Sequence, residues 1–296
     1  MDRRTCLQGL LGAASGWTPL FAGAGVATAI SQSQISERFA SIEKTSGGRL
    51  GVQVLDTGNQ RTWGHRVDER FLMCSSFKLL AAARVLDRVA RGEESLSRRI
   101  AYGKADLLPN SDITRRHAAQ GAMSLGALCH ATVTESDNTA AQLILASYGG
   151  PAGLTRWLRT LGDETTRLDR DEPMLNEWDP TRTLDTSTPA AMARTVAALT
   201  VGQQALPQAE REQLVRWMKA CVTGKRRIRA GLPADWAIGH KTGTSGRGEL
   251  IDLALVWPPR RAPIVVTAYI AESTARHDVA ESALADVGRL LPALIA

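Results

Sequence analysis

Strand-like segments lie at both ends of this chain, and the long stretch between them has helical spacing. At both ends, apolar residues either alternate with other residues, as Leu50, Val52 and Val54 do, or form short runs bounded by turn-forming residues. The strand-like segments are residues 49–56, 62–66, 236–244, 250–258 and 264–271. A turn at residues 57–59 makes the first two segments a hairpin. Parts of the chain that are far apart in sequence therefore have to share one sheet.

The middle of the chain has apolar residues three and four positions apart and no convincing strand. Its expected helices are residues 77–90, 124–132, 139–148, 151–161, 188–201 and 207–218, and further helices are expected at 35–45 and after residue 271. These patterns predict an α+β fold: one antiparallel sheet, flanked by N- and C-terminal helices, with an inserted all-α domain. We expect the sheet domain to comprise residues 30–67 and 219–296, and the all-α domain residues 68–218.

Residues 1–29 have the outline of an export signal. No charged residue occurs between Arg4 and Glu37, the pair Arg3-Arg4 resembles a twin-arginine motif, and 27–29 fits a small-x-small cleavage site. An uncleaved membrane anchor is the alternative, but glycines and a proline interrupt the apolar run. We therefore expect a removed leader, a periplasmic or secreted protein and no stable membrane anchor.

Charge and cysteine content narrow the function classes. The net charge of +6 comes from 36 basic residues scattered among 30 acidic ones, so we expect no nucleic-acid partner. The four cysteines would become three after leader removal, which argues against a disulfide framework, and we expect Cys74 to be a packing residue. No cysteine or histidine cluster has metal-ligand spacing, so we expect no metal and no cofactor.

Three short motifs carry the chemistry. Ser75 and Lys78 stand three residues apart at the start of a helical run, so that an amine lies one turn from a hydroxyl. Backbone N–H groups at such a helix start also favour negative charge near the serine. The second motif is Ser136-Asp137-Asn138 and the third is Lys241-Thr242-Gly243, the latter within an expected strand. Taken singly, they could be a chance match, a helix cap and a strand end, but the three in this order are specific.

From about residue 35 to its end, the chain resembles the class A beta-lactamases. Besides the three motifs, its expected long loop at 166–187 contains Glu172, Leu175 and Asn176, which match the family's Glu-x-x-Leu-Asn signature. Related penicillin-binding transpeptidases lack that glutamate and remain acylated. The resemblance therefore implies hydrolysis of penicillins and cephalosporins, which would confer resistance to these antibiotics.

The resemblance also implies roles for single residues. Ser75 would attack the lactam carbonyl, with either Lys78 or a water held by Glu172 taking its proton. Backbone N–H groups of Ser75 and Thr244 would form the oxyanion hole. Ser136 would pass a proton to the leaving nitrogen.

The substrate-binding positions implied in the same way are Asn138, Asn176, Lys241, Thr242, Gly243, Thr244 and Arg227. Asn138 would bind the acyl amide, and Lys241 would supply positive potential near Ser136 and the substrate carboxylate. Glu172 and Asn176 would hold the deacylating water. Arg170 and Asp185, near the two ends of the loop, would close it with a bidentate ion pair.

Three departures from the family pattern stand out. Many members bind the substrate carboxylate through an arginine on the strand after Lys-Thr-Gly, and that strand has none here. Arg227 aligns with the position that some members use instead, so the resemblance implies that Arg227 pairs with the substrate carboxylate; a surface charge is the alternative. The stretch Asn110-Ser111 is polar where many relatives place an aromatic wall. A disulfide that some carbapenem-hydrolysing members form through the cysteine before the nucleophile has no partner here, because the partner position is Ser245.

Two other functions remain open from the residues. One is a periplasmic D,D-peptidase, which Glu172 and Asn176 argue against. The other is a beta-lactam sensor that acylates and stops, but such sensors carry a transmembrane signalling segment, and only the leader here is apolar enough. We expect a monomer that acts on small-molecule beta-lactams.

Overall fold

One antiparallel sheet joins the two ends of the chain. The computed structural model of the protein describes residues 31–179 and 181–296. Its five-stranded sheet has the order β2-β1-β9-β8-β7. The strands are β1 (Arg49–Asp56), β2 (Thr62–His65), β7 (Ala237–Thr244), β8 (Leu250–Trp257) and β9 (Ile264–Ala271). Because β1 pairs along its whole length with β9, the predicted sheet built from both terminal segments is confirmed.

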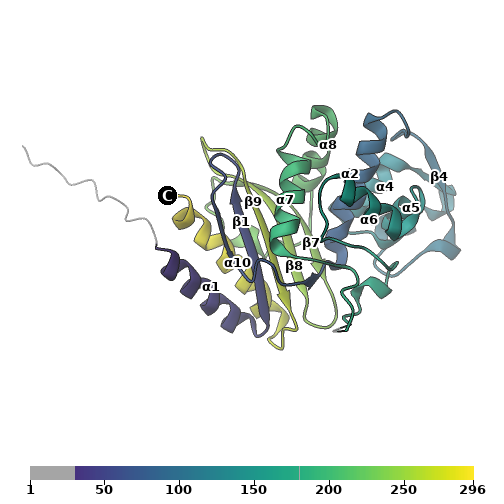
Figure 1. The fold of residues 1–296 in the computed structure, drawn as a ribbon. Helices are drawn as coiled ribbons and strands as arrows, with labels where there is room; N and C mark the ends of the chain where they lie inside the picture. The colour runs from purple at the N-terminus through teal and green to yellow at the C-terminus, as the bar shows by residue number, and fades with distance from the viewer. Residues whose placement is uncertain (1–30, 180) are drawn as a thin grey trace, which may run out of the picture.

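Helices cover both faces of this sheet (Figure 1). On one face lie the terminal helices α1 (Gln32–Ser46) and α10 (His277–Leu294), which pack against Ala254, Val266 and Ile270. On the other face, Leu253 and Val265 belong to the core shared with the central helices. Strands β8 and β9 are therefore apolar on both faces, which explains their continuous apolar runs.

The middle of the chain is mainly helical, as predicted. Its helices are α2 (Phe77–Ala90), α3 (Asp112–His117), α4 (Leu125–Thr134), α5 (Asn138–Ala146), α6 (Gly150–Thr160), α7 (Pro189–Thr200) and α8 (Gln208–Lys219), and the short α9 (Ile228–Gly231) follows. Helix α2 is buried along most of its length, and Figure 1 shows it beside α4, α5 and α6. The boundaries of the helices expected between residues 77 and 218 agree with the observed ones to within two residues, whereas α1 begins three residues before the expected residue 35.

The expectation that this middle segment holds no strand is wrong in detail. Two small ladders occur in it: β3 (Phe71–Leu72) with β6 (Thr186–Ser187), and β4 (Arg99–Ala101) with β5 (Ala122–Ser124). Ladders of two or three residues are too short to produce a visible alternation in the sequence. We retain the division into a sheet domain (30–67 and 219–296) and a helical domain (68–218) as a proposal.

Close packing between the start of α2 and strand β7 positions the site. The turn Cys74–Ser76, a single 3-10 turn, leads directly into α2. A Cβ atom on Gly243 of β7 would lie 2.8 Å from the Met73 carbonyl oxygen and 3.2 Å from the Ser76 nitrogen. Only glycine allows this approach without displacing the turn. The first and third motifs are thereby brought side by side.

The expected leader at 1–29 lies outside the described residues. Among the residues that the structure does describe, no helix has both the length and the apolar character needed to cross a bilayer.

Replacing Phe39 of α1 with Ala tests the packing of the terminal helices on the sheet. Phe39 is fully buried in the core beneath α1 and α10, so its loss should reduce the free energy of unfolding by about 3–5 kcal/mol. The exposed neighbour Arg38, replaced with Ala, is the control and should change little. Urea unfolding followed by circular dichroism measures both; equal effects would contradict this packing.

Candidate active site

Ser75 and Lys78 are in direct contact, as their spacing predicted. Lys78 Nζ lies 2.9 Å from Ser75 Oγ. Ser75 belongs to the turn that precedes α2, and Lys78 lies in the first turn of the helix with its side chain fully buried. The serine hydroxyl therefore has a basic nitrogen as its immediate neighbour.

Lys78 connects three parts of the chain. Its Nζ donates to the Ser136 carbonyl oxygen at 2.8 Å and to Asn138 Oδ1, and it lies 3.4 Å from Glu172 Oε1. Burial lowers the pKa of Lys78, while the nearby charge of Glu172 acts in the opposite direction. A lowered pKa makes the neutral amine, a potential proton acceptor, more accessible near neutral pH.

In the second motif, the neighbouring residues Asp137 and Ser136 have different roles. Asp137 caps α5: its carboxylate accepts from the Ala140 N–H at 2.9 Å and from Thr114. The helix-cap interpretation of this motif is thus correct for Asp137. Ser136, in a left-handed conformation with φ of 62°, points its hydroxyl between two lysines, 3.3 Å from Lys78 Nζ and 3.0 Å from Lys241 Nζ. A non-glycine residue in this conformation is held there by its surroundings.

Lys241 reaches the same hydroxyl from strand β7. Its side chain is fully buried, and Nζ also donates to the Thr242 carbonyl oxygen at 2.7 Å. Burial, together with the positive charge of Lys78, lowers the pKa of Lys241 to about 7. Two buried amines therefore converge on Ser136.

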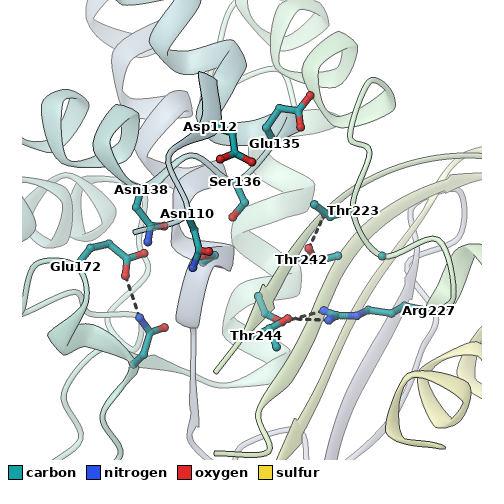
Figure 2. A pocket seen from close by; sticks show the side chains of 14 residues that line it. Asn110, Asp112, Glu135, Ser136, Asn138, Glu172, Thr223, Arg227, Thr242 and Thr244 are labelled. Carbon is teal, nitrogen blue, oxygen red and sulfur yellow. Dashed lines mark hydrogen bonds between the residues drawn. The ribbon is translucent and has the colours of Figure 1, made fainter. Parts of the chain in front are cut away.

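Glu172 and Asn176 face the serine from the long loop. Asn176 Nδ2 donates to Glu172 Oε2 at 2.9 Å (Figure 2), and the 3-10 turn Met174–Asn176 brings the two side chains together. Glu172 is buried. Among the described residues, Glu172 Oε1 and Asn176 Oδ1 are buried acceptors without a hydrogen-bond donor. Two acceptors of this kind, close to each other, suit a water molecule.

The loop is closed by Asp185, but not by the predicted bidentate pair. Arg170 Nε contacts Asp185 Oδ2 at 2.5 Å, whereas Arg170 Nη2 donates to the Glu177 carbonyl oxygen at 2.6 Å. Asp185 Oδ1 instead accepts the backbone N–H groups of Asp169 and Arg170 at 2.7 and 2.9 Å. The guanidinium therefore bridges the fully buried carboxylate to the loop backbone, which holds Glu172 in place.

Arg227 is a buried residue of the site and not a surface charge. Its guanidinium donates to the carbonyl oxygens of Gly243 and Ile251 at 2.8 and 2.9 Å and to Thr244 Oγ1 at 2.7 Å. It also lies 3.4 Å from Glu281. Figure 2 shows the guanidinium turned towards Thr244 at the pocket wall.

These residues surround one pocket of about 350 Å³. The lining residues are Ser75, Asn110, Asp112, Glu135, Ser136, Asn138, Glu172, Asn176, Thr223, Gly224, Arg227, Thr242, Gly243 and Thr244. Lys78 and Lys241 are not themselves lining residues, but they contact the lining residues Ser75 and Ser136 through their amines. The predicted site residues are therefore all brought together.

Sequence reasoning missed part of the rim. Asp112, Glu135, Thr223 and Gly224 line the pocket, and none belongs to a motif. Asn110, at the polar stretch noted above, has a φ of 55°, and its carbonyl oxygen accepts from the Asn138 N–H at 3.1 Å. Only the fold places these residues, since no local pattern distinguishes them from surface residues.

The fold and the site together define an active-site-serine enzyme whose nucleophile lies between a helix start and a sheet edge. A family model described as "Beta-lactamase enzyme family" matches residues 33–294. The chain belongs to this family, and within it to class A.

Comparisons with individual relatives support the same family assignment. The chain is 42% identical over 296 residues to beta-lactamase AST-1 of Nocardia asteroides, covering 98% of this chain and 95% of that protein. It is 44% identical over 257 residues to the carbapenem-hydrolyzing beta-lactamase KPC of Klebsiella oxytoca, covering 86% and 87% of the two chains. A solved ancestral class A beta-lactamase superposes with a TM-score of 0.85 and 55% identity, over 88% of this chain and 99% of that one.

Changing Asp185 to Asn tests the closure of the loop. The substitution removes the charge that accepts two backbone N–H groups and Arg170, so the free energy of unfolding should fall by about 1.5–3 kcal/mol. The loop should also be cleaved faster by trypsin. Asp179→Asn, a change at a partly exposed aspartate of the same loop, is the control, and equal trypsin sensitivity of the two variants would contradict the assignment.

Proposed function

We propose that the protein hydrolyses the beta-lactam amide of penicillins and cephalosporins through an acyl-enzyme on Ser75. The observation that carries this proposal is the arrangement of Ser75, Lys78 and Glu172: the amine contacts the hydroxyl at 2.9 Å, and the carboxylate lies 3.4 Å beyond the amine. A nucleophile, a base and a second base are thus available for the two halves of the reaction. Such an activity confers resistance to these antibiotics.

In acylation, Ser75 Oγ attacks the lactam carbonyl carbon. Lys78 can take the hydroxyl proton directly, and Glu172 can take it through a water molecule. The negative charge that develops on the carbonyl oxygen is stabilised by the backbone N–H groups of Ser75 and Thr244. Opening of the ring then requires a proton on the lactam nitrogen.

Ser136 supplies that proton. Its hydroxyl lies within 3.3 Å of Lys78 Nζ and 3.0 Å of Lys241 Nζ, so that either amine can replace the proton. Asn138 binds the acyl amide of the substrate. Because Asn138 Oδ1 accepts from Lys78, its amide nitrogen remains for donation to the substrate carbonyl.

Deacylation separates this reaction from that of a peptidase or a sensor. Glu172 and Asn176 together hold a water molecule and deprotonate it for attack on the ester. A D,D-peptidase or a sensor lacks such a base and retains the acyl group. The paired side chains, and their two acceptor oxygens that lack a hydrogen-bond donor within the described residues, favour turnover.

The substrate carboxylate binds near Lys241, Thr242, Gly243 and Thr244. Arg227 acts through Thr244: it donates to Thr244 Oγ1, which leaves the threonine hydroxyl hydrogen free to point at the carboxylate. This is a more indirect role than the ion pair inferred from sequence. It still adds positive potential to the same end of the pocket.

We further propose that the protein is exported to the periplasm or secreted and acts as a monomer. The pattern of residues 1–29 supports export.

Replacing Glu172 with Ala should uncouple the two half-reactions. Turnover should fall by about 10²–10⁴-fold, because a positioned general base is lost. At least some penicillins should still acylate Ser75, so that a burst of one product per enzyme is followed by an accumulating adduct. Rapid-mixing absorbance and intact-protein mass spectrometry measure the burst and the adduct.

Ser75→Ala is the control and should form no adduct at all. Steady hydrolysis by the Glu172 variant within a few-fold of the parent, without an adduct, would place the water-activating base elsewhere. With the unmodified protein, a chromogenic cephalosporin distinguishes repeated turnover from the single burst of a sensor.

Replacing Arg227 with Ala should raise KM for carboxylate-bearing substrates more than it lowers kcat, since the loss concerns substrate binding. Arg226→Ala is the matched control: this neighbouring arginine is largely exposed and pairs with Glu281. Steady-state kinetics with a penicillin give both constants. If the two variants behave alike, Arg227 has no part in recognising the carboxylate.

The pKa of Lys241 predicts a pH dependence. The charged amine attracts the substrate carboxylate, and its pKa is about 7, so kcat/KM should fall as the pH rises through 7 and the amine loses its proton. Lys78, Arg227, Glu172 and Cys221 are the neighbouring charged or titratable groups.

Lys241→Arg keeps a permanent positive charge and should weaken this fall between pH 7 and 9. A substrate whose carboxylate is esterified provides the control, because its kcat/KM should lack the same alkaline limb. Identical alkaline limbs in the parent and the variant would assign the titration to another group.

A further inference from the structure

A second chemically distinctive cluster lies behind the active-site strand. His240 of β7 and Asp252 of β8 are both fully buried, and His240 Nδ1 lies 2.9 Å from Asp252 Oδ1. Asp252 Oδ2 also accepts from the Ile228 N–H at 3.3 Å. The carboxylate fixes the orientation of the imidazole and raises the pKa of His240 to about 9, although burial opposes this. Asp252 therefore favours the protonated form of this imidazole.

Cys221 lies beside this imidazole. It follows α8, and its thiol stands near the ring without a hydrogen bond of normal geometry to it. Within the described part of the chain, His240 Nε2, at the edge of the ring away from Asp252, is buried and has no hydrogen-bond partner. Burial raises the pKa of the Cys221 thiol, but His240 and the charge of Lys241 outweigh it and lower the pKa to about 7.

The other two cysteines of the described chain have different surroundings. Cys74 and Cys129 are both completely buried, and burial raises the pKa of each thiol. Cys221 retains 7% exposure and is followed by the exposed Val222. Among the three described thiols, Cys221 is thus the one with a lowered pKa and without complete burial.

We propose that Cys221 is a covalent modification site for small sulfur electrophiles, namely disulfides and thiosulfonates, with His240 stabilising its thiolate and Asp252 orienting His240. The thiolate attacks one sulfur of the reagent, a mixed disulfide forms on Cys221, and the other half leaves as a thiolate or a sulfinate. No further oxidant is needed, since the reagent itself is reduced. A reducing thiol reverses the reaction.

The modification site is coupled to the pocket. Cys221 Sγ lies 3.2 Å from Thr223 Oγ1. Thr223 Oγ1 in turn lies 2.7 Å from Thr242 Oγ1 (Figure 2). Both threonines line the active site. The space here is tight: a Cβ on Gly224 would lie 2.5 Å from Thr242 Cγ2 and 3.1 Å from His240 Cε1. A group added to Cys221 therefore has to displace the segment that carries Thr223 and Gly224, which should reduce turnover.

Methyl methanethiosulfonate tests the proposal, because it adds only an S–CH₃ group and releases methanesulfinate. The full-length protein is treated at pH 7, and the adduct is located by peptide mass spectrometry. We expect modification of Cys221, at a rate at least tenfold above that of Cys74 and Cys129; the peptide with Cys6 is scored separately. Modification of Cys74 or Cys129 at the same rate, or no reaction at Cys221 in the folded protein, overturns the site.

A separate measurement of activity tests the coupling between Cys221 and the active site. Hydrolysis of a chromogenic cephalosporin should fall in proportion to the Cys221 adduct and return with dithiothreitol, whereas the activity of Cys221→Ser should not respond to the reagent. A full adduct without a change in activity overturns the coupling. Labelling does not depend on the proposed beta-lactam hydrolysis, so the two proposals can fail separately.

His240→Gln tests the role of the imidazole and should slow labelling of Cys221 at pH 7, with circular dichroism confirming the fold. Because the buried Asp252 loses its partner in this variant, the labelling selectivity of the parent remains the decisive measurement. Unchanged labelling in a folded variant would remove His240 from the site.

Discussion

The burial of two lysines around one serine hydroxyl is the constraint on which this structure depends. Lys78 and Lys241 are both fully buried, and their side chains converge on Ser136. Burying an ammonium group is costly unless hydrogen bonds and opposite charge compensate it. Here the compensation comes from carbonyl oxygens, from Asn138 and from Glu172. This compensation is incomplete, so burial still lowers the pKa values of Lys78 and Lys241. Lowered pKa values suit proton transfer near neutral pH.

Such a cluster needs rigid supports from separate parts of the chain. Lys78 is supplied by the buried helix α2, Lys241 by strand β7 and Ser136 by the segment that Asp137 ties to α5 and Thr114. The contact between Gly243 and the turn after Met73 sets the distance between the helix and the strand. A side chain at position 243 would separate them, so the geometry of the site depends on a residue with no side chain of its own.

Much of this arrangement could be predicted from the sequence, because both the periodicity and the motifs are local signals. The strands at the two ends and the long helices follow from residues close together in the chain. The meeting of the three motifs, which are far apart in sequence, was implied by the resemblance to class A beta-lactamases. Other features depend on long-range packing. The rim residues Asp112 and Glu135 have no local pattern. For the second motif, the sequence offered a helix cap and a functional serine as alternatives, and the structure has both, the cap at Asp137 and the hydroxyl at Ser136. The resemblance suggested a bidentate pair for Arg170, but its second donor is taken by the Glu177 carbonyl oxygen.

For the cysteines as well, the surroundings of each thiol in the structure are more informative than the number of cysteines in the sequence. The odd number that leader removal would leave argued against a disulfide framework; in the described residues Cys74, Cys129 and Cys221 are free. Sequence reasoning gave attention to Cys74, because it precedes the nucleophile, yet its surroundings raise the pKa of its thiol. Cys221 has no motif, and its partner His240 lies 19 positions away in sequence, directly before Lys241. The strand that places the Lys241 amine in the catalytic cluster thus places the imidazole of His240 near a thiol on its other side. Because neighbouring residues of a strand point to opposite sides, one strand serves two clusters of different chemistry.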